Sequence, residues 1–285
     1  MNYNNFFNSV KKSFLKKPMA LFCNHTSYDN GSGRYFLQIL EREGNLKKIF
    51  IPEHGFFAEL QDQEPVDNTS VYSFLSKDTK FISLYGNKRE QNGILLRGEL
   101  KEVEVLVIDI QDIGSRYFTY VTLIGNIFDL IHQEGFNIKV IVIDRPNPAG
   151  RQVEGTLMTA EYASFIGQEG LPHRHGLTLG EICNYLHVNI KANFPLEVIR
   201  YSTDSPYDPV EIYPSPNMPS INAVRLFSGT CLLEGTNISE GRGTTRTFEM
   251  FGAPFLQFVF SDKLGNFNKL SICENKKAIS NGSIA

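Results

Sequence analysis

The chain of 285 residues contains no tryptophan, so any aromatic binding surface must be built from its 22 phenylalanines and 12 tyrosines. It also lacks an excess of positive charge, because 28 lysines and arginines stand against 31 aspartates and glutamates, for a net charge of −3. A nucleic-acid-binding protein needs a basic face or stripe. The composition therefore predicts no nucleic-acid partner.

Long apolar runs are missing as well. No stretch approaches the roughly 18 consecutive apolar residues of a membrane-spanning helix. The N-terminal segment carries lysines but no apolar region ahead of the first predicted strand, which is not typical of a signal peptide. We therefore expect a cytoplasmic protein without a membrane span, and the sequence does not define its oligomeric state.

Cysteines are few and lie far apart, at Cys23, Cys183, Cys231 and Cys273. Zinc sites and disulfide frameworks require short, regular spacings, so neither is predicted, and buried free thiols are expected. Two histidines flank Arg174, but no third ligand lies in frame with them. We predict no metal site and no cofactor.

Short apolar runs rich in β-branched residues predict buried strands. These runs cover residues 19–23, 48–51, 103–110, 138–144 and 196–201. Helical patterns lie between them. The alternation of strands and helices predicts an α/β fold with a doubly wound, mainly parallel sheet.

The clearest helical pattern covers residues 117–131, where apolar side chains recur on one face, and it ends at Gly135. Residues 95–100 predict a shorter helix.

Two further helices are predicted from their ends. One is expected to begin with Asp29 or Asn30 as its cap and to end at Gly44. The other begins with a capping-box sequence, in which Thr178 precedes Glu181 by three positions. Glu181 is therefore interpreted as a capping residue.

The pattern of the sequence changes after Gly150, where the regular alternation of predicted strands and helices gives way to predicted loops. We expect four parts: an N-terminal extension (1–18), an α/β domain (19–190), a smaller C-terminal α+β domain (191–255) and an irregular tail (256–285).

Polar clusters follow three of the predicted strands. Glu53 and His54 follow the second strand, Asp112 and Arg116 follow the third, and Arg145 follows the fourth. In an open α/β sheet, ligands bind outside the carboxyl ends of the strands. We expect the three clusters to meet at one edge, rich in carboxylates and guanidiniums.

Two acids near the predicted strand ends, Glu53 and Asp109, allow alternative interpretations. Glu53, close to Phe56 and Phe57 in sequence, is either a general acid or a cap for the following turn. Asp109 lies inside an apolar run, where an unpaired carboxylate is costly, so it needs a partner, either Arg116 or Arg145. That pair is either structural or catalytic.

The run from Glu234 to Arg246 combines glycines, threonines and acids. It follows no strand–helix frame and lacks the Gly-Lys-Ser/Thr ending, so a phosphate-binding loop is not predicted. A hydroxyl-rich loop with paired acids favours a carbohydrate ligand.

Nine strings of the chain, in this order, resemble the exo-β-N-acetylmuramidase family, whose members are NamZ- or YbbC-like glycoside hydrolases. They are IPEHGF, SLYG, DIQDIGSRYFTYV, VIDRPNP, VEGTLM, RHGLTLGE, PSPNMP, GTCLLEGTN and SEGRGTTRTFE. The resemblance covers residues 19–255 and implies a Rossmann-like N-terminal domain, a smaller C-terminal domain and an active site in the cleft between them. Family members continue beyond the Gly-Ala-Pro string, so an incomplete C-terminal domain is expected here.

The resemblance also implies an activity, which is the release of N-acetylmuramic acid from the non-reducing ends of peptidoglycan fragments. The implied partners are peptidoglycan-derived muramyl saccharides. Glu53 becomes the favoured acid, and the second carboxyl is expected from Glu240, with Asp112 or Glu234 next. The expected substrate-binding residues are His54, Asp109, Arg116, Tyr117, Arg145, His175, Asn217, Glu234, Asn237 and Arg242.

Muramic acid carries a lactyl carboxylate, which a planar guanidinium can bind through two hydrogen bonds. Arg116, Arg145 and Arg242 are the candidates for that contact. Tyr117 or Phe56 is expected to stack on the sugar ring.

Two other functions stay open from the sequence. One is a protein that binds muramyl sugars with weak or no turnover. The other is a metal-dependent phosphoester hydrolase that uses Asp109, Asp112 and His54 around Mg²⁺.

Overall fold

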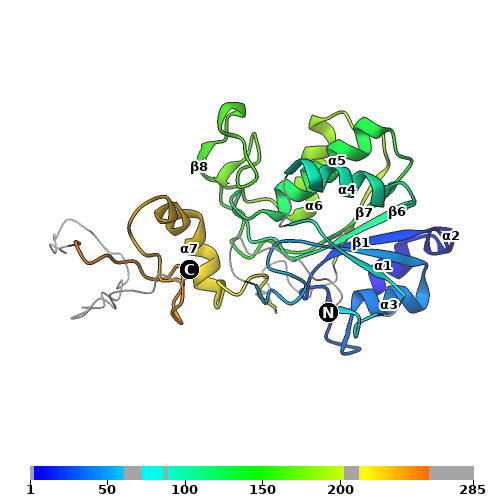
Figure 1. The fold of residues 1–285 in the computed structure, drawn as a ribbon, viewed down its shortest axis with the longest axis horizontal. Helices are drawn as coiled ribbons and strands as arrows, with labels where there is room; N and C mark the ends of the chain where they lie inside the picture. The colour runs from blue at the N-terminus through cyan, green and yellow to red at the C-terminus, as the bar shows by residue number, and fades with distance from the viewer. Residues whose placement is uncertain (1–2, 61–71, 77, 86–88, 202–211, 257–285) are drawn as a thin grey trace. The chain divides into compact units, whose positions relative to one another are not determined.

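The computed structural model describes residues 3–60, 72–76, 78–85, 89–201 and 212–256. Its centre is a six-stranded sheet in the order β10-β7-β6-β1-β4-β5, and each paired neighbour runs parallel (Figure 1). The strands are β1 (Met19–Cys23), β4 (Leu46–Ile51), β5 (Lys80–Ser83), β6 (Val105–Asp109), β7 (Lys139–Asp144) and β10 (Leu196–Arg200). The predicted α/β fold with a mainly parallel sheet is confirmed.

The strand order has a functional consequence. The chain builds one half of the sheet outward from β1 and then returns to build the other half from β6. This is the doubly wound order, in which ligands bind at the carboxyl ends of the two central strands. The switch point of this sheet, which is the place where the direction of strand addition reverses, therefore lies between β1 and β6.

Burial on both faces explains why the strands are continuous apolar runs. All five residues of β1 and all five of β6 are buried, as are four of the six in β7. Met19, Leu21 and Cys23 of β1 point to one face, where they join a core with Phe36 and Leu37.

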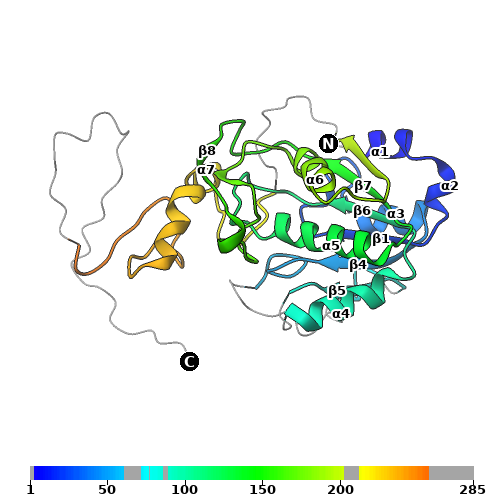
Figure 2. The same cartoon turned by 90° about the horizontal axis from the view of Figure 1, so that it is seen from above.

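Helices cover both faces of the sheet, as Figures 1 and 2 show. The helices are α1 (Asn4–Ser9), α2 (Lys12–Leu15), α3 (Phe36–Glu43), α4 (Arg89–Leu100), α5 (Tyr120–Glu134) and α6 (Leu179–Asn189). The first three lie on one side, and α4, α5 and α6 lie on the other. Phe6 and Val10 of the expected N-terminal extension are buried in the core, so this segment packs onto the sheet.

Two helix ends agree with the sequence. α5 stops at Gly135, which takes the left-handed conformation with φ +63°. At the start of α6, the Thr178 side chain accepts a hydrogen bond from the Glu181 amide, and the Glu181 carboxylate accepts one from the Thr178 amide. The capping box is therefore confirmed.

The expected cap of α3 is wrong. The residue before the helix is Tyr35, not Asp29 or Asn30. Instead, β2 (Tyr28–Asp29) and β3 (Arg34–Tyr35) form a short antiparallel hairpin, and the Asp29 carboxylate accepts a hydrogen bond from the Ser32 amide in its turn. An aspartate side chain closes such turns as readily as it caps helices.

The chain divides into two compact units, Met1–Pro216 and Asn217–Ala285. The first also contains a hairpin that the sequence did not predict, formed by β8 (Glu154–Leu157) and β9 (Pro172–Arg174), with η2 (Ala160–Tyr162) between them. The described part of the second unit contains α7 (Ile221–Thr230) and η3 (Cys231–Gly235). The domain limits proposed from the sequence stay a prediction, and most of the expected tail lies outside the described residues.

Within the described ranges, no helix combines the length and apolar character that crossing a membrane requires. Cys23, Cys183 and Cys231 are buried free thiols, as expected, and Cys273 lies outside those ranges.

Candidate functional site

The switch point is lined by a polar cluster that the sequence analysis did not assign to the site. Asn24 and Thr26 follow β1 and are buried. The Asn24 Oδ1 accepts hydrogen bonds from the Thr26 amide and hydroxyl, at 3.0 and 2.6 Å. The Thr26 Oγ1 in turn accepts one from the Gln111 amide at 3.2 Å, which ties the ends of β1 and β6 together. The only sequence signal was that β1, too, stops at polar residues.

Glu53 lies just beyond β4 and is 5% exposed. The Thr119 hydroxyl, at the N-terminus of α5, donates to the Glu53 Oε2 at 2.9 Å. His54 and Gly55 both have positive φ angles, +73° and +82°, so the chain turns sharply here. The His54 Nδ1 lies 3.0 Å from the carbonyl of Leu60, so this ring contacts its own loop.

Asp109 pairs with Arg145, one of the two arginines expected to neutralise its buried carboxylate. The Arg145 Nε donates to the Asp109 Oδ1 at 2.8 Å, and the Asp109 side chain is fully buried. Its other oxygen accepts the hydroxyls of Tyr3, at 2.6 Å, and Ser27. Burial alone would lower the pKa of Arg145, but the Asp109 carboxylate raises it above the usual value. Asp109 is therefore fully occupied by structural contacts.

Arg145 has further contacts beside its ion pair with Asp109. Its Nη2 donates to the Tyr3 hydroxyl at 3.2 Å, and its guanidinium carbon lies 4.2 Å from the ring centre of Tyr201. Burial and the charge of Asp109 raise the pKa of Tyr3. The N-terminal segment therefore supplies part of the shell around this ion pair.

Asp112 lies in the buried loop after β6 and is 3% exposed. Its Oδ2 accepts the Gly114 amide at 2.7 Å and lies 3.4 Å from the His175 Nε2. The His175 Nδ1 accepts the Leu177 amide, so the ring proton sits on Nε2 and faces Asp112. His175 therefore contacts Asp112 in this structure.

Arg116 and Tyr117 join the same loop to the β8–β9 hairpin. The Arg116 Nη1 donates to the carbonyls of Thr156 and Leu171, at 2.6 and 3.0 Å. Its Nη2 lies 3.1 Å from the His173 Nε2, and the Tyr117 hydroxyl contacts the His173 Nδ1. Burial and the neighbouring Arg116 charge lower the pKa of His173, which favours the neutral ring that accepts from Arg116.

The second unit contains an acidic and basic cluster of its own. The Arg242 Nε lies 3.0 Å from Glu240, which is 7% exposed, and its Nη2 lies 2.8 Å from Glu234. Asn217 is buried and Asn237 is exposed. Because Glu53 and Glu240 lie in different units, the expected pairing of these two carboxyls stays a prediction.

All three guanidiniums expected to bind a lactyl carboxylate have protein partners. Arg116 binds backbone carbonyls, Arg145 binds Asp109, and Arg242 binds Glu234 and Glu240. Of the three, Arg242 is the most accessible, with 28% of its side chain exposed. A substrate carboxylate would reach it only by competing with two glutamates.

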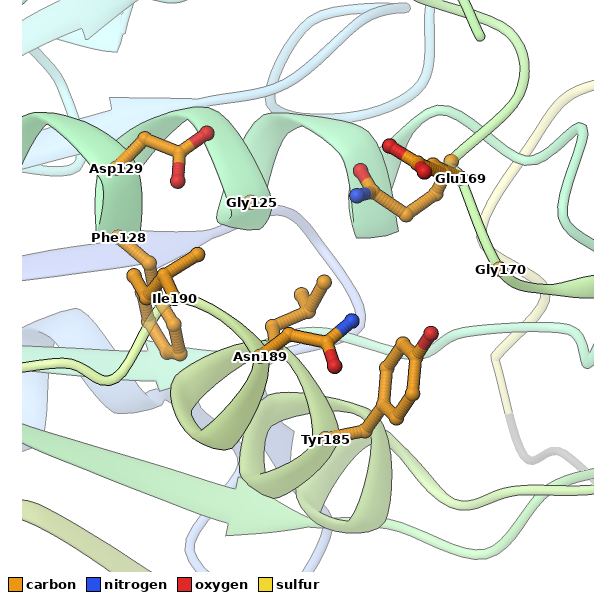
Figure 3. Close-up of a pocket in the computed structure, with 10 residues that line it drawn as sticks. Gly125, Phe128, Asp129, Glu169, Gly170, Tyr185, Asn189 and Ile190 are labelled. Atoms are coloured by element: carbon orange, nitrogen blue, oxygen red, sulfur yellow. The ribbon is translucent and has the colours of Figure 1, made fainter. Parts of the chain in front are cut away.

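A pocket of about 450 Å³ lies between α5 and α6 (Figure 3). Phe128, Leu186 and Ile190 supply its apolar part, and Asp129 and Tyr185 supply polar groups. None of the residues expected to bind substrate lines it. Across the described ranges, no group of three or more His, Cys, Asp or Glu side chains is placed to bind a metal ion.

The strand order and the buried charged groups at the carboxyl edge define a class, an open-sheet α/β protein with its candidate site at the switch point. Sequence models described as the N-terminal and C-terminal parts of exo-beta-N-acetylmuramidase NamZ match residues 19–222 and 225–271. The chain belongs to the NamZ family.

The peptidoglycan beta-N-acetylmuramidase NamZ of Bacillus subtilis (strain 168) is 34% identical over 258 residues, which cover 87% of this chain and 59% of that protein. Two crystal structures of DUF1343 family proteins from Bacteroides fragilis are also similar. Their TM-scores are 0.70 and 0.67, at 30% and 29% identity, covering 87% and 89% of this chain and 66% and 63% of theirs. The chain thus spans about three fifths to two thirds of the length of these relatives.

Proposed function

We propose that this protein is an exo-acting glycoside hydrolase that releases N-acetylmuramic acid from the non-reducing ends of peptidoglycan fragments. The observation that carries the proposal is the 34% identity to the Bacillus subtilis muramidase, which extends over 87% of this chain. The buried carboxyl of Glu53, at the carboxyl edge of the sheet, supports it, because such enzymes work with carboxyl groups.

In the proposed mechanism, Glu53 protonates the oxygen of the leaving group. The Thr119 hydroxyl donates to one carboxyl oxygen of Glu53, Oε2, and so helps to orient the carboxyl group. Glu240 is our first choice for the second carboxyl, which acts as nucleophile or base, and Glu234 is the next. Asp112 stands level with Glu234, because both carboxylates already have partners: Gly114 and His175 for Asp112, and Arg242 for Glu234.

The acid role of Glu53 is tested with two substrates that differ only in their leaving group. A 4-nitrophenyl β-N-acetylmuramide needs little protonation to depart, whereas the phenyl analogue needs much more. Removal of a general acid costs about 10²–10⁴-fold in rate where protonation matters. We expect Glu53→Gln to lose activity mainly on the phenyl substrate.

The matched control is Glu161→Gln, because Glu161 is an exposed residue of η2. It should hydrolyse both substrates at the unmodified rate. Equal losses on both substrates in Glu53→Gln would point to a nucleophile or base in place of an acid. Unimpaired hydrolysis of both by Glu53→Gln would rule out either role.

A further inference from the structure

Tyr120, the first residue of α5, makes two hydrogen bonds that join distant parts of the chain. Its side chain is 1% exposed. The hydroxyl accepts from the Asn24 Nδ2 at 2.9 Å and donates to the carbonyl of Pro214 at 3.0 Å. Burial and the negative charge of Glu53 raise the pKa of Tyr120, so the phenol keeps the proton that it donates.

The Pro214 carbonyl belongs to the connecting segment, residues 212–216, which precedes the second unit. This segment has a second anchor, because the His25 Nε2 lies 2.9 Å from the carbonyl of Tyr213. A carbonyl only accepts hydrogen bonds, so the Nε2 of His25 carries the proton. Residues that follow β1 and residues that begin α5 thus hold the connecting segment at the switch point.

The same helix start holds the proposed acid. Thr119 immediately precedes Tyr120, and its hydroxyl donates to Glu53 at 2.9 Å. That hydroxyl makes no capping hydrogen bond to the α5 backbone. The position of the Thr119 hydroxyl is therefore set by where the first turn of α5 lies, and Tyr120 fixes that turn at two points.

We propose that Tyr120 is a positioning residue for Glu53: its bonds to Asn24 and Pro214 fix the first turn of α5, so that the Thr119 hydroxyl keeps the Glu53 carboxyl in one orientation. This inference rests on the proposed function, in which Glu53 is the acid. Tyr120 itself is too deeply buried to contact a substrate, so it acts through its neighbour.

A loss of orientation at Glu53 and a loss of folding stability have different kinetic effects. A proton donor that is free to rotate still allows the substrate to bind, but it is in the right place for a smaller part of the time. An interaction needed only in the transition state lowers kcat and leaves KM nearly unchanged when it is lost. A merely structural defect would lower the amount of folded enzyme without changing the kcat of the folded fraction.

The kinetic test compares Tyr120→Phe, which removes one hydroxyl, with the control Tyr185→Phe. The control also removes one tyrosine hydroxyl, but from the pocket between α5 and α6. On the phenyl β-N-acetylmuramide, Tyr120→Phe should lower kcat about tenfold and keep KM within about twofold. Thr119→Val should have a similar effect, and Thr119→Ser should restore most of the rate. Tyr185→Phe should match the unmodified protein.

A double variant tests whether the two hydroxyls act on the same group. If Tyr120 acts through Thr119, combining Tyr120→Phe with Thr119→Val should lower kcat by little more than either change alone. Effects that multiply in full would show that the two residues act independently, which would overturn the proposal.

A second measurement does not depend on turnover. In protein labelled with ¹³C at the glutamate carboxyl, the Glu53 signal is identified by its loss in Glu53→Gln. We expect that signal to shift in Tyr120→Phe and to stay in place in Tyr185→Phe. If the unmodified protein turns over no muramide and the signal still shifts, the function fails and the positioning stands. If hydrolysis proceeds and neither the signal nor kcat responds to Tyr120→Phe, the positioning fails and the function stands.

Discussion

The guanidinium of Arg145 donates to the carboxylate of Asp109 at 2.8 Å, and both side chains are at least nine-tenths buried. Asp109 ends β6 and Arg145 immediately follows β7, so the pair joins two neighbouring strands at their carboxyl ends. Its surroundings include Tyr3 from the N-terminal segment, which makes it a contact between three distant parts of the sequence.

Removal of Arg145 should strongly destabilise the fold. Arg145→Leu leaves the Asp109 carboxylate buried without a cation, and the loss of one partner from a buried pair costs about 3–5 kcal/mol. Because the chain has no tryptophan, urea unfolding is best followed by circular dichroism. The midpoint should fall well below that of the unmodified protein.

An exposed ion pair supplies the control for that experiment. Lys17 and Glu104 approach to 2.6 Å, but their side chains are 41% and 47% exposed. Lys17→Gln should therefore change the free energy of unfolding by no more than about 1 kcal/mol. An Arg145→Leu protein as stable as Lys17→Gln would contradict the structural role of the buried pair.

Gly114 is predicted to tolerate no side chain. Its φ angle is +81°, and a Cβ atom there would lie 2.4 Å from the Asn147 Oδ1. Gly114→Ala combines backbone strain of about 1–3 kcal/mol with displacement of Asn147, which bonds the carbonyl of Leu177. Thermal unfolding should shift to clearly lower temperature.

Gly98 is the matched substitution with the opposite expectation. It lies inside α4, and a Cβ atom there would meet nothing within 4 Å. Gly98→Ala should stabilise the protein by about 0.5–1 kcal/mol, because alanine favours the helix more than glycine does. If both alanines had the same effect, the tight turn at Gly114 would be refuted.

The sequence predicted those features that depend on local pattern. The buried strands appear as apolar runs, and α5 appears as an apolar face that ends at Gly135, because burial on one side of a helix leaves a regular spacing. The partner of Asp109 was narrowed to two arginines, because a buried carboxylate must be paired.

The features that the sequence missed depend on backbone groups. Arg116 binds the carbonyls of Thr156 and Leu171, and Tyr120 binds the carbonyl of Pro214. Every residue carries a carbonyl, so no pattern of side chains marks these contacts. For the same reason, Arg116 looked like a free ligand for a carboxylate although it holds the β8–β9 hairpin.

The buried thiols allow a test of the core. Cys23, Cys183 and Cys231 are buried, and burial raises the pKa of Cys23 and Cys183, so both stay as unreactive thiols. With four cysteines in the chain, a thiol reagent such as DTNB should label at most one in the folded protein and all four in denaturant. Rapid labelling of two or more in the folded protein would contradict the burial of these side chains.

His173 should make the fold sensitive to mild acid. Its pKa in the folded protein is lowered by burial and by the Arg116 charge, so the unfolded chain, with a histidine pKa of about 6.5, takes up a proton more readily. The stability that His173 contributes is therefore complete above about pH 6.5 and is lost as the pH falls through the folded pKa.

The measurement compares the free energy of unfolding at about pH 7.5 and about pH 5.5 for the unmodified protein and His173→Gln. Glutamine keeps an oxygen that accepts from Arg116 but takes up no proton. The loss of stability on acidification should be smaller in His173→Gln than in the unmodified protein. His25, whose pKa is also lowered by burial, is present in both proteins, so its contribution cancels in the difference. An equal loss in the two proteins would show that His173 takes up its proton as readily in the folded state as in the unfolded state.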